Sequence, residues 1–236
     1  ATPLPAEGVA AHVQLDQLDA DAWERTFSSA AGVEVRTAAT AAATVLPRVG
    51  PAVGDANASL GYLPSTLALR AERLTVRGRH FHRVVLGGSR DGPQWQANVD
   101  ADELNGYVSV RQSGPGTAGN VYARLARLQL EPSAASDVEQ LLQQPTTSVP
   151  ALDITVGELI LAGRNLGRVE VEAINRGGPL RGSEWRLTKL KLGAPEARLS
   201  ATGNWATLGG SSAAQRRTAL NFRLDIDDSG ELLNRF

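Results

Sequence analysis

The sequence predicts a mainly β fold of tandem curved antiparallel sheets that form an open groove, a repeating β-groove with short helices between its units. Two observations predict this class: an internal repeat and a period-two alternation of apolar residues. The stretch Leu67–Val84 returns 85 positions later as Leu152–Val169, with its leucines, glycine, arginines and valine at the same spacing. A unit of roughly 80 to 90 residues is longer than a common solenoid repeat, so each unit is expected to be a small sheet.

The repeat continues beyond this stretch. Three later segments have counterparts: Trp95–Ala97 in Trp185–Leu187, Tyr107–Val110 in Arg198–Ala201, and Ala123–Leu130 in Ala219–Ile226.

Alternation places Leu67, Leu69 and Ala71 on one face of the first repeated strand. The phase then slips, because Leu74 and Val76 are offset by one residue from that register. A slip of one residue turns apolar side chains to the wrong face unless a bulge or bend compensates for it. The second copy slips at the same place, which indicates a feature built into both units.

Short helices are expected after strands. Asp19 can cap a helix whose Trp23 and Phe27 share a face, Ser136–Glu139 matches a capping box, and Asp228–Glu231 has the same role before a leucine pair. Turns between antiparallel neighbours are expected at Gly78, at Gly163, at the Asn105–Gly106 pair and at Gly87–Gly88.

The chain is therefore divided into four parts. Residues 1–36 are the end of a preceding repeat unit, with a strand and a short helix. Residues 37–63 are an insertion rich in Ala, Gly and Pro. Residues 64–149 and 150–236 are two successive repeat units. Because the chain starts without Met and stops in mid-pattern, we expect it to be part of a longer protein.

Composition excludes several functions. Lys+Arg 24 against Asp+Glu 25 gives a net charge of −1, so there is no basic field for nucleic acid. Cysteine is absent, which excludes disulfides, thiolate metal sites and a cysteine nucleophile. No apolar run reaches the roughly 18 to 20 residues that span a bilayer.

Candidate metal sites are weak. His80 and His82 share one strand face, but no acidic residue is expected in register with them, and two ligands are a poor start for a metal site. The run Asp225–Gly230 has acids at positions 1 and 3 of a calcium loop, but Phe236 stands where such a loop has Glu. We therefore expect no metal and no cofactor.

Candidate catalytic groups are equally weak. Ser89 is not in a nucleophile elbow. The acid pairs Asp100 with Asp102 and Glu170 with Glu172 could mimic a glycosidase pair, but alternation puts each on the polar side of a strand. Sugar stacking is one reading of the tryptophans Trp95, Trp185 and Trp205, and structural packing at strand ends is the stronger one. We expect no catalytic residue and no enzyme.

The apolar strand faces are the remaining candidate site. A sheet with one apolar face must cover that face with a second sheet, a helix or an apolar ligand. The one or two short helices expected in each unit are too few to cover so many strands. Strand phase alone selects the residues that would line a lipid groove: Leu67, Leu69, Leu152, Ile154, Val169, Val171, Leu187, Leu199, Leu220 and Phe222.

Several segments, in this order along the chain, resemble the YhdP-type branch of the AsmA-like envelope proteins of Gram-negative bacteria. The resemblance covers 65–236 and, more loosely, 12–27. It rests on Trp95 with Asp102–Tyr107, Val121–Leu125, Pro150–Ile154, Gly163–Arg168, Glu184–Leu187, Thr202–Trp205 and Phe222–Gly230.

The resemblance implies a periplasmic, bridge-like lipid transport protein, tethered to the inner membrane by an anchor outside this fragment. Its hydrophobic channel would carry phospholipid acyl chains toward the outer membrane. The implied partners are these acyl chains and the adjoining repeat units of the full-length chain, with no nucleic acid. Arg79 and Arg164 are candidates to meet lipid phosphates at the groove mouth, and both suit a plain surface position equally well. The alternatives are a non-catalytic scaffold module of the envelope and, less favoured, a carbohydrate-binding module.

Overall fold

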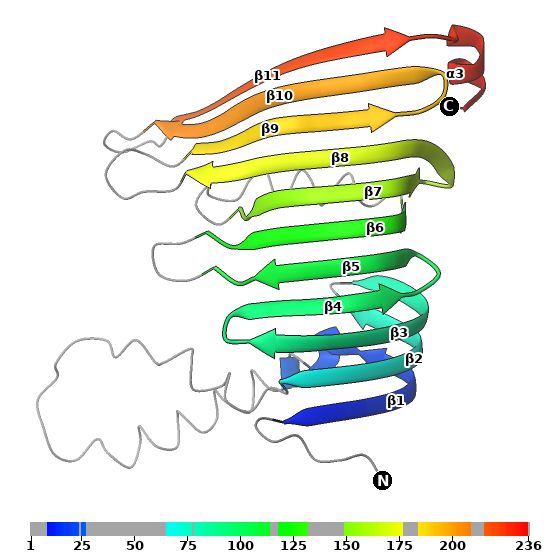
Figure 1. Cartoon of the computed structure of the whole chain (residues 1–236), viewed down its shortest axis with the longest axis vertical. Helices are drawn as coiled ribbons and strands as arrows, with labels where there is room; N and C mark the ends of the chain where they lie inside the picture. The colour runs from blue at the N-terminus through cyan, green and yellow to red at the C-terminus, as the bar shows by residue number, and fades with distance from the viewer. Residues whose placement is uncertain are drawn as a thin grey trace, which may run out of the picture.

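A computed structural model describes residues 9–23, 25–26, 65–76, 78–113, 118–131, 149–176, 184–208 and 215–235. The predicted β class is confirmed: these ranges form one open sheet of eleven strands, accompanied within them by two short helices. The strands stack in chain order along the long axis of the molecule (Figure 1). They are β1 (Ala10–Asp19), β2 (Thr66–Val76), β3 (Arg79–Asp91), β4 (Gln94–Asp100), β5 (Leu104–Arg111), β6 (Asn120–Leu130), β7 (Ala151–Leu161), β8 (Arg164–Arg176), β9 (Glu184–Gly193), β10 (Ala197–Leu208) and β11 (Gln215–Ile226).

The repeat is visible as two five-strand sets, a first set of β2–β6 and a second set of β7–β11. Neighbouring strands within each set are antiparallel. The sets are joined by a parallel pair, β6 with β7, and β1 pairs with β2 in the same parallel way. These parallel joints make one continuous sheet of the two units, a detail that the apolar pattern did not predict.

Two predicted helix caps are confirmed. The Asp19 Oδ1 atom accepts a hydrogen bond of 2.9 Å from the Ala22 N–H, at the start of the helix described at residues 20–23 and 25–26. The Asp228 Oδ1 atom accepts one of 3.0 Å from the Glu231 N–H, at the start of α3 (Ser229–Arg235). In both places a strand runs straight into a capped helix. Phe27, the Ser136 helix and the 37–63 insertion lie outside the described residues.

Two of the predicted turns are confirmed and two are wrong. Gly78 and Gly163 lie in the β2–β3 and β7–β8 hairpins, with φ of 71° and 78°. Asn105–Gly106 lies inside β5, at a shift in its register with β6. Gly87–Gly88 lies inside β3, and that strand turns only at Gly92. Glycine marks a bulge or a close backbone approach inside a strand as readily as it marks a turn.

The predicted phase slip is present in both sets. Strict alternation would place Ala71 and Leu74 on opposite faces, because they are an odd number of positions apart, yet both belong to one buried cluster. Between them, the pairing of β2 with β3 skips Glu72 and Arg83. In the second set the register shifts between Val156 and Leu159. Such irregularities bend strands and increase their twist. The start of β8 bends at this place in Figure 1.

Gly167 makes the bend of the second set sterically possible. Its φ is 79°, and a Cβ atom there would lie 2.1 Å from the Gly193 carbonyl oxygen. Arg83 has the corresponding role in the first set, with a φ of 52°. A side chain at the Gly167 position would force two strand backbones apart.

The sheet is a single layer in the part of the chain that the structure describes. Each strand makes its extensive contacts only with its sheet neighbours. Two buried clusters lie along one face, the first around Val84 and the second around Val156. None of the described helices has the length and apolar character of a membrane span.

We predict that Gly167→Ala lowers the free energy of unfolding by at least about 2 kcal/mol, because the new Cβ meets a backbone oxygen and the residue keeps a left-handed φ. Urea denaturation measures the effect. Gly87→Ala is the matched control, since no atom lies within 4 Å of its added Cβ. Equal stability of the two variants would contradict the role given to Gly167.

Candidate functional site

One face of the sheet carries unbroken apolar rows across the strands. We call a set of residues that face one another through successive ladder pairs a row. The first row crosses all eleven strands through Ala11, Leu67, Gly88, Ala97, Val108, Ala123, Ile154, Val171, Leu190, Ala201 and Phe222. The second row crosses them through Val13, Leu69, Leu86, Val99, Gly106, Leu125, Val156, Val169, Leu192, Leu199 and Leu224.

A third row lies on the other side of the first. It begins at Arg90 in β3 and is apolar from β4 onward, through Trp95, Val110, Val121, Leu152, Ala173, Leu187, Gly203 and Leu220. Directly facing residues in a sheet point to the same side. The three rows therefore form one continuous surface, which we call the apolar face.

The structure brings all ten predicted groove residues onto the apolar face. Four lie in the first row, three in the second and three in the third. In row order they are Leu67, Ile154, Val171 and Phe222; Leu69, Val169 and Leu199; and Leu152, Leu187 and Leu220. Their lipid contacts stay a prediction. The sequence pattern gave the face of each residue but not the connection of the faces through the parallel joint.

Exposure along the apolar face is uneven. Val84 and Val156 are 1% and 2% exposed, packed among neighbouring leucines, alanines and valines. The large apolar side chains of the last strand, β11, are 47% to 70% exposed, and Phe222 is the most exposed of them. Leaving a side chain of this size in water costs about 2 kcal/mol relative to burying it. The face thus has a packed middle and an apolar border open to a ligand or another strand.

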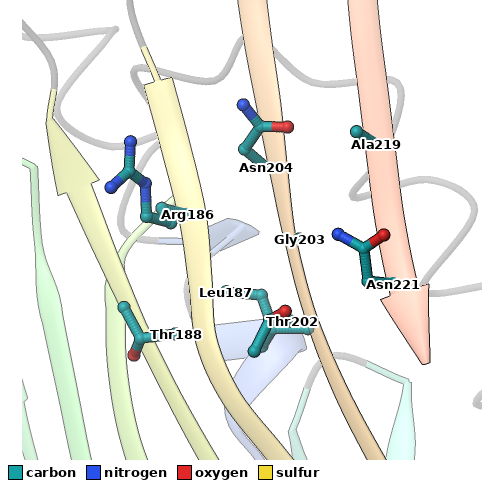
Figure 2. A pocket seen from close by; sticks show the side chains of 8 residues that line it. All are labelled: Arg186, Leu187, Thr188, Thr202, Gly203, Asn204, Ala219 and Asn221. Atoms are coloured by element: carbon teal, nitrogen blue, oxygen red, sulfur yellow. The ribbon is translucent and has the colours of Figure 1, made fainter. Parts of the chain in front are cut away.

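The opposite face is polar. The row behind the first and second rows runs through Ala68, Gly87, Asn98, Tyr107, Arg124, Thr155, Glu170, Lys191, Ser200 and Arg223. A shallow pocket of about 400 Å³ lies over β9–β11. Arg186, Asn204 and Asn221 are among the residues that line it, together with Leu187 and Gly203 of the third row (Figure 2). The Glu184 carboxylate accepts hydrogen bonds from Arg186 and Asn204, at 2.9 and 3.4 Å. These polar groups form hydrogen bonds with one another, as is usual for side chains on a solvated surface.

A chain of ion pairs runs over the polar face of the second set. The Lys189 Nζ atom lies 2.7 Å from Glu170 Oε2 and 3.0 Å from Glu172 Oε1. Hydrogen bonds from Lys189 and then from Arg168 lower the pKa of Glu170, and the bond to Glu170 raises the pKa of Lys189. Cations on both sides thus favour the ionised form of Glu170, whereas a glycosidase pair needs one protonated acid.

The histidine pair has an acidic neighbour that lies outside the strand register. Glu103 does lie beside His82, with its Oε1 atom 2.6 Å from the ring Nδ1 atom, and His80 Nδ1 lies 3.0 Å from the Thr75 hydroxyl. Even so, no cluster of three or more His, Asp or Glu side chains among the described residues could hold a metal. The loop between β4 and β5 brings Glu103 to His82, and strand register alone does not reveal that approach.

The remaining polar candidates have structural partners. Asp225 pairs with Arg223 at 3.0 Å and Asp227 with Arg198, while Asp228 caps α3. Ser89 lies inside β3, where its hydroxyl accepts a hydrogen bond of 3.1 Å from Gln96.

The two acids at the β4–β5 turn are also engaged. Asp100 accepts a hydrogen bond of 2.9 Å from Asn105, and Asp102 is paired with Arg83. The two carboxylates therefore do not act on a shared site.

The tryptophans pack as strand-end residues. Trp205 is 6% exposed and faces Trp185, whose indole N–H donates a hydrogen bond of 2.9 Å to the Pro150 carbonyl. Trp95 faces Arg90, whose guanidinium carbon lies 5.7 Å from the ring centre. Trp185 and Trp205 form part of the sheet's packing, while Trp95 lies in the third row of the apolar face.

Comparison with known protein families decides the assignment. The family model described as YhdP protein matches residues 1–236. The chain belongs to the YhdP family. The resemblance to the YhdP-type AsmA-like proteins is thus confirmed, and membership suggests an envelope protein with a lipid-transport role. Neither a curated protein nor a solved structure gives a match.

For this YhdP-family chain, we predict that Lys189→Gln raises the pKa of Glu170 toward its ordinary value, because the main hydrogen bond that lowers it is lost. A pH titration of the carboxyl carbon by NMR measures the shift. In the wild type, the Lys189–Glu170 pair stabilises the folded state fully at pH values above the ordinary pKa of Glu. This stabilisation is lost as the pH falls through the lowered pKa of Glu170. Lys189→Arg keeps the charge and should keep the pKa low. An unchanged pKa in Lys189→Gln would contradict the assignment.

Proposed function

We propose that this chain is a segment of a periplasmic bridge-like lipid transport protein, in which the apolar face forms a hydrophobic groove for phospholipid acyl chains between the inner and outer membranes. The observation that carries the proposal is the continuity of the first and second rows across eleven strands. No polar side chain interrupts either row, so a hydrocarbon chain meets no desolvation barrier along them.

The absence of a second layer over the described strands supports the same function. Burial of apolar surface is favourable at about 25 cal/mol per Å² and has no directional requirement. Acyl chains of different length and saturation would be accepted alike. The groove makes and breaks no bond, and its role needs no cofactor.

The groove would have a rim suited to head groups. Arg79 and Arg164 occupy equivalent places, beside the β2–β3 and β7–β8 turns, and face Val76 and Leu161 at the ends of the ladders. Guanidinium groups bind phosphate through charge-assisted hydrogen bonds. Lipid phosphates at this rim would stay in water while their tails lie on the rows.

In the full-length protein, the repeat units 64–149 and 150–236 would stand in series with adjoining units. The strand and helix within 1–36 would end the preceding one. The inner-membrane tether would belong to a part of the protein outside this fragment. Such an arrangement extends the rows from unit to unit through parallel joints like that of β6 with β7.

We predict that phospholipid accompanies the purified chain when no delipidation step is used. Solvent extraction followed by mass spectrometry identifies it, and denatured protein gives the background. Complete absence of lipid would favour a scaffold module of the envelope, whose sheets are filled by protein alone.

We also predict that Leu199→Asp reduces bound lipid about tenfold or more, because an unpaired carboxylate in the second row repels hydrocarbon. Leu152→Asp should act similarly in the third row. Both side chains are half buried, so the melting temperature should change little. The matched control, Ser200→Asp, places the same charge on the polar face of the same strand.

A closed core would give a different result. There, Leu199→Asp and Leu152→Asp would unfold the chain as severely as Val156→Asp, which introduces a charge at a site 2% exposed. Comparable melting temperatures for all three variants would overturn the groove. Unchanged lipid content in the first two would do the same.

A further inference from the structure

The apolar face is hollowed over the first set. A cavity of about 280 Å³ lies above β2–β5, lined on the apolar face by Leu67, Leu86, Gly88, Ala97, Val108 and Val110, with Trp95 among their neighbours. The side chains at its centre are small because Gly88 and Ala97 face each other across β3 and β4. On the same two strands, the second row carries the larger Leu86 and Val99.

The repeat shows that the residues at the centre of the hollow differ between the two sets. In the second set, Leu152 pairs with Ala173 and Ala173 with Leu187, as Leu67 pairs with Gly88 and Gly88 with Ala97 in the first. The sites of Gly88 and Ala97 thus hold the larger Ala173 and Leu187.

A second pair of positions differs in the same direction. Trp205 faces Trp185 as Val110 faces Trp95, so a tryptophan that is 6% exposed stands where the first set has a valine. Three positions of the shared frame thus carry larger side chains in the second set, while the Val108 position carries the smaller Gly203.

A cation borders the hollow. Arg90 shares the apolar face with Trp95, its direct ladder partner, and its guanidinium carbon lies 5.7 Å from the ring centre. Its counterpart in the second set is Asn175, which faces Trp185 and donates a hydrogen bond of 2.6 Å to the Val149 carbonyl. The first set thus combines an apolar hollow with a positive charge at its end, and the second set has a neutral, internally bonded amide.

From this difference we infer that the first set holds a preferred binding site for a single phospholipid, with one acyl chain in the hollow and its phosphate against Arg90. The inference rests on the proposed function and adds to it a fixed position along the groove, with the phosphate at the end of β3 opposite to Arg79. An apolar cavity accepts the chain, and a cation at its end selects an amphiphile with an anionic head group over a neutral lipid.

The test uses the full chain and a phosphatidylglycerol with a diazirine in one acyl chain, followed by mapping of the photolabelled residues by mass spectrometry. Labelling of Leu67, Val99 and Val108 should exceed that of second-set residues Leu152 and Leu190 by about fivefold or more, because the cavity retains the chain. Labelling spread evenly over both sets would overturn the inference while leaving the proposed groove intact. No labelling on any row would refute both.

A second test uses variants that place second-set residues at the equivalent positions of the first set. Ala97→Leu should reduce labelling of the hollow by about fivefold or more, because it fills the cavity with the residue found at the Leu187 position. Val110→Trp copies Trp205 and provides a second test if Ala97→Leu does not fold. Ala68→Leu adds the same volume to the polar face of β2 and should leave labelling unchanged. Full labelling in folded Ala97→Leu and Val110→Trp would overturn the inference.

The head group is tested separately. Arg90→Asn should weaken retention of the phosphatidylglycerol probe about tenfold, because a charge-assisted hydrogen bond is lost. It should leave labelling by a diacylglycerol with the same chains unchanged. An equal effect on both lipids would overturn the role of Arg90 in binding phosphate. Equal retention of a diazirine fatty acid by the wild type would overturn the assignment to a phospholipid.

Discussion

The structure depends on keeping apolar residues on one side of a single sheet over eleven strands. Because side chains alternate with a period of two, one unmatched residue in any strand would send every later leucine of that strand to the polar side. The sheet meets this constraint with irregularities that are shared between neighbours. Glu72 and Arg83 are omitted together from the ladder of β2 and β3, and the corresponding shift recurs between Val156 and Leu159. The rows continue because neighbouring strands slip together.

The same constraint explains the distribution of small residues. Where strands bend, backbones approach closely, and a Cβ at Gly106 would lie 2.3 Å from the Arg124 carbonyl oxygen. Glycine at such points contributes no side chain to the packing, but it allows the close backbone approach that keeps the apolar face continuous. Gly88 in the first row also approaches a neighbouring backbone, since a Cβ there would lie 2.8 Å from the Gln96 carbonyl oxygen, and it lines the hollow of the first set. Bends and hollows are therefore produced by the same residue type in different rows.

Much of this could be predicted from the sequence because it is local. The β class, the repeat, the phase slip, the caps of Asp19 and Asp228 and the face of every predicted groove residue follow from periodicity and from short hydrogen-bonding motifs. What failed depends on partners distant in sequence. The approach of Glu103 to His82 and the parallel pairing of β6 with β7 leave no periodic signal. Alignment by residue pattern also matched Val108 with Leu199, whereas the ladders give Gly203 as its counterpart.

The odd number of strands in each set has a geometric consequence. Five antiparallel strands followed by a parallel joint return the chain to the direction in which it started, so β2 and β7 run the same way. The β2–β3 and β7–β8 turns consequently lie along the same margin of the sheet. A protein built this way can change its length by whole modules without inverting left and right, and any chemistry confined to one margin stays on that side from end to end.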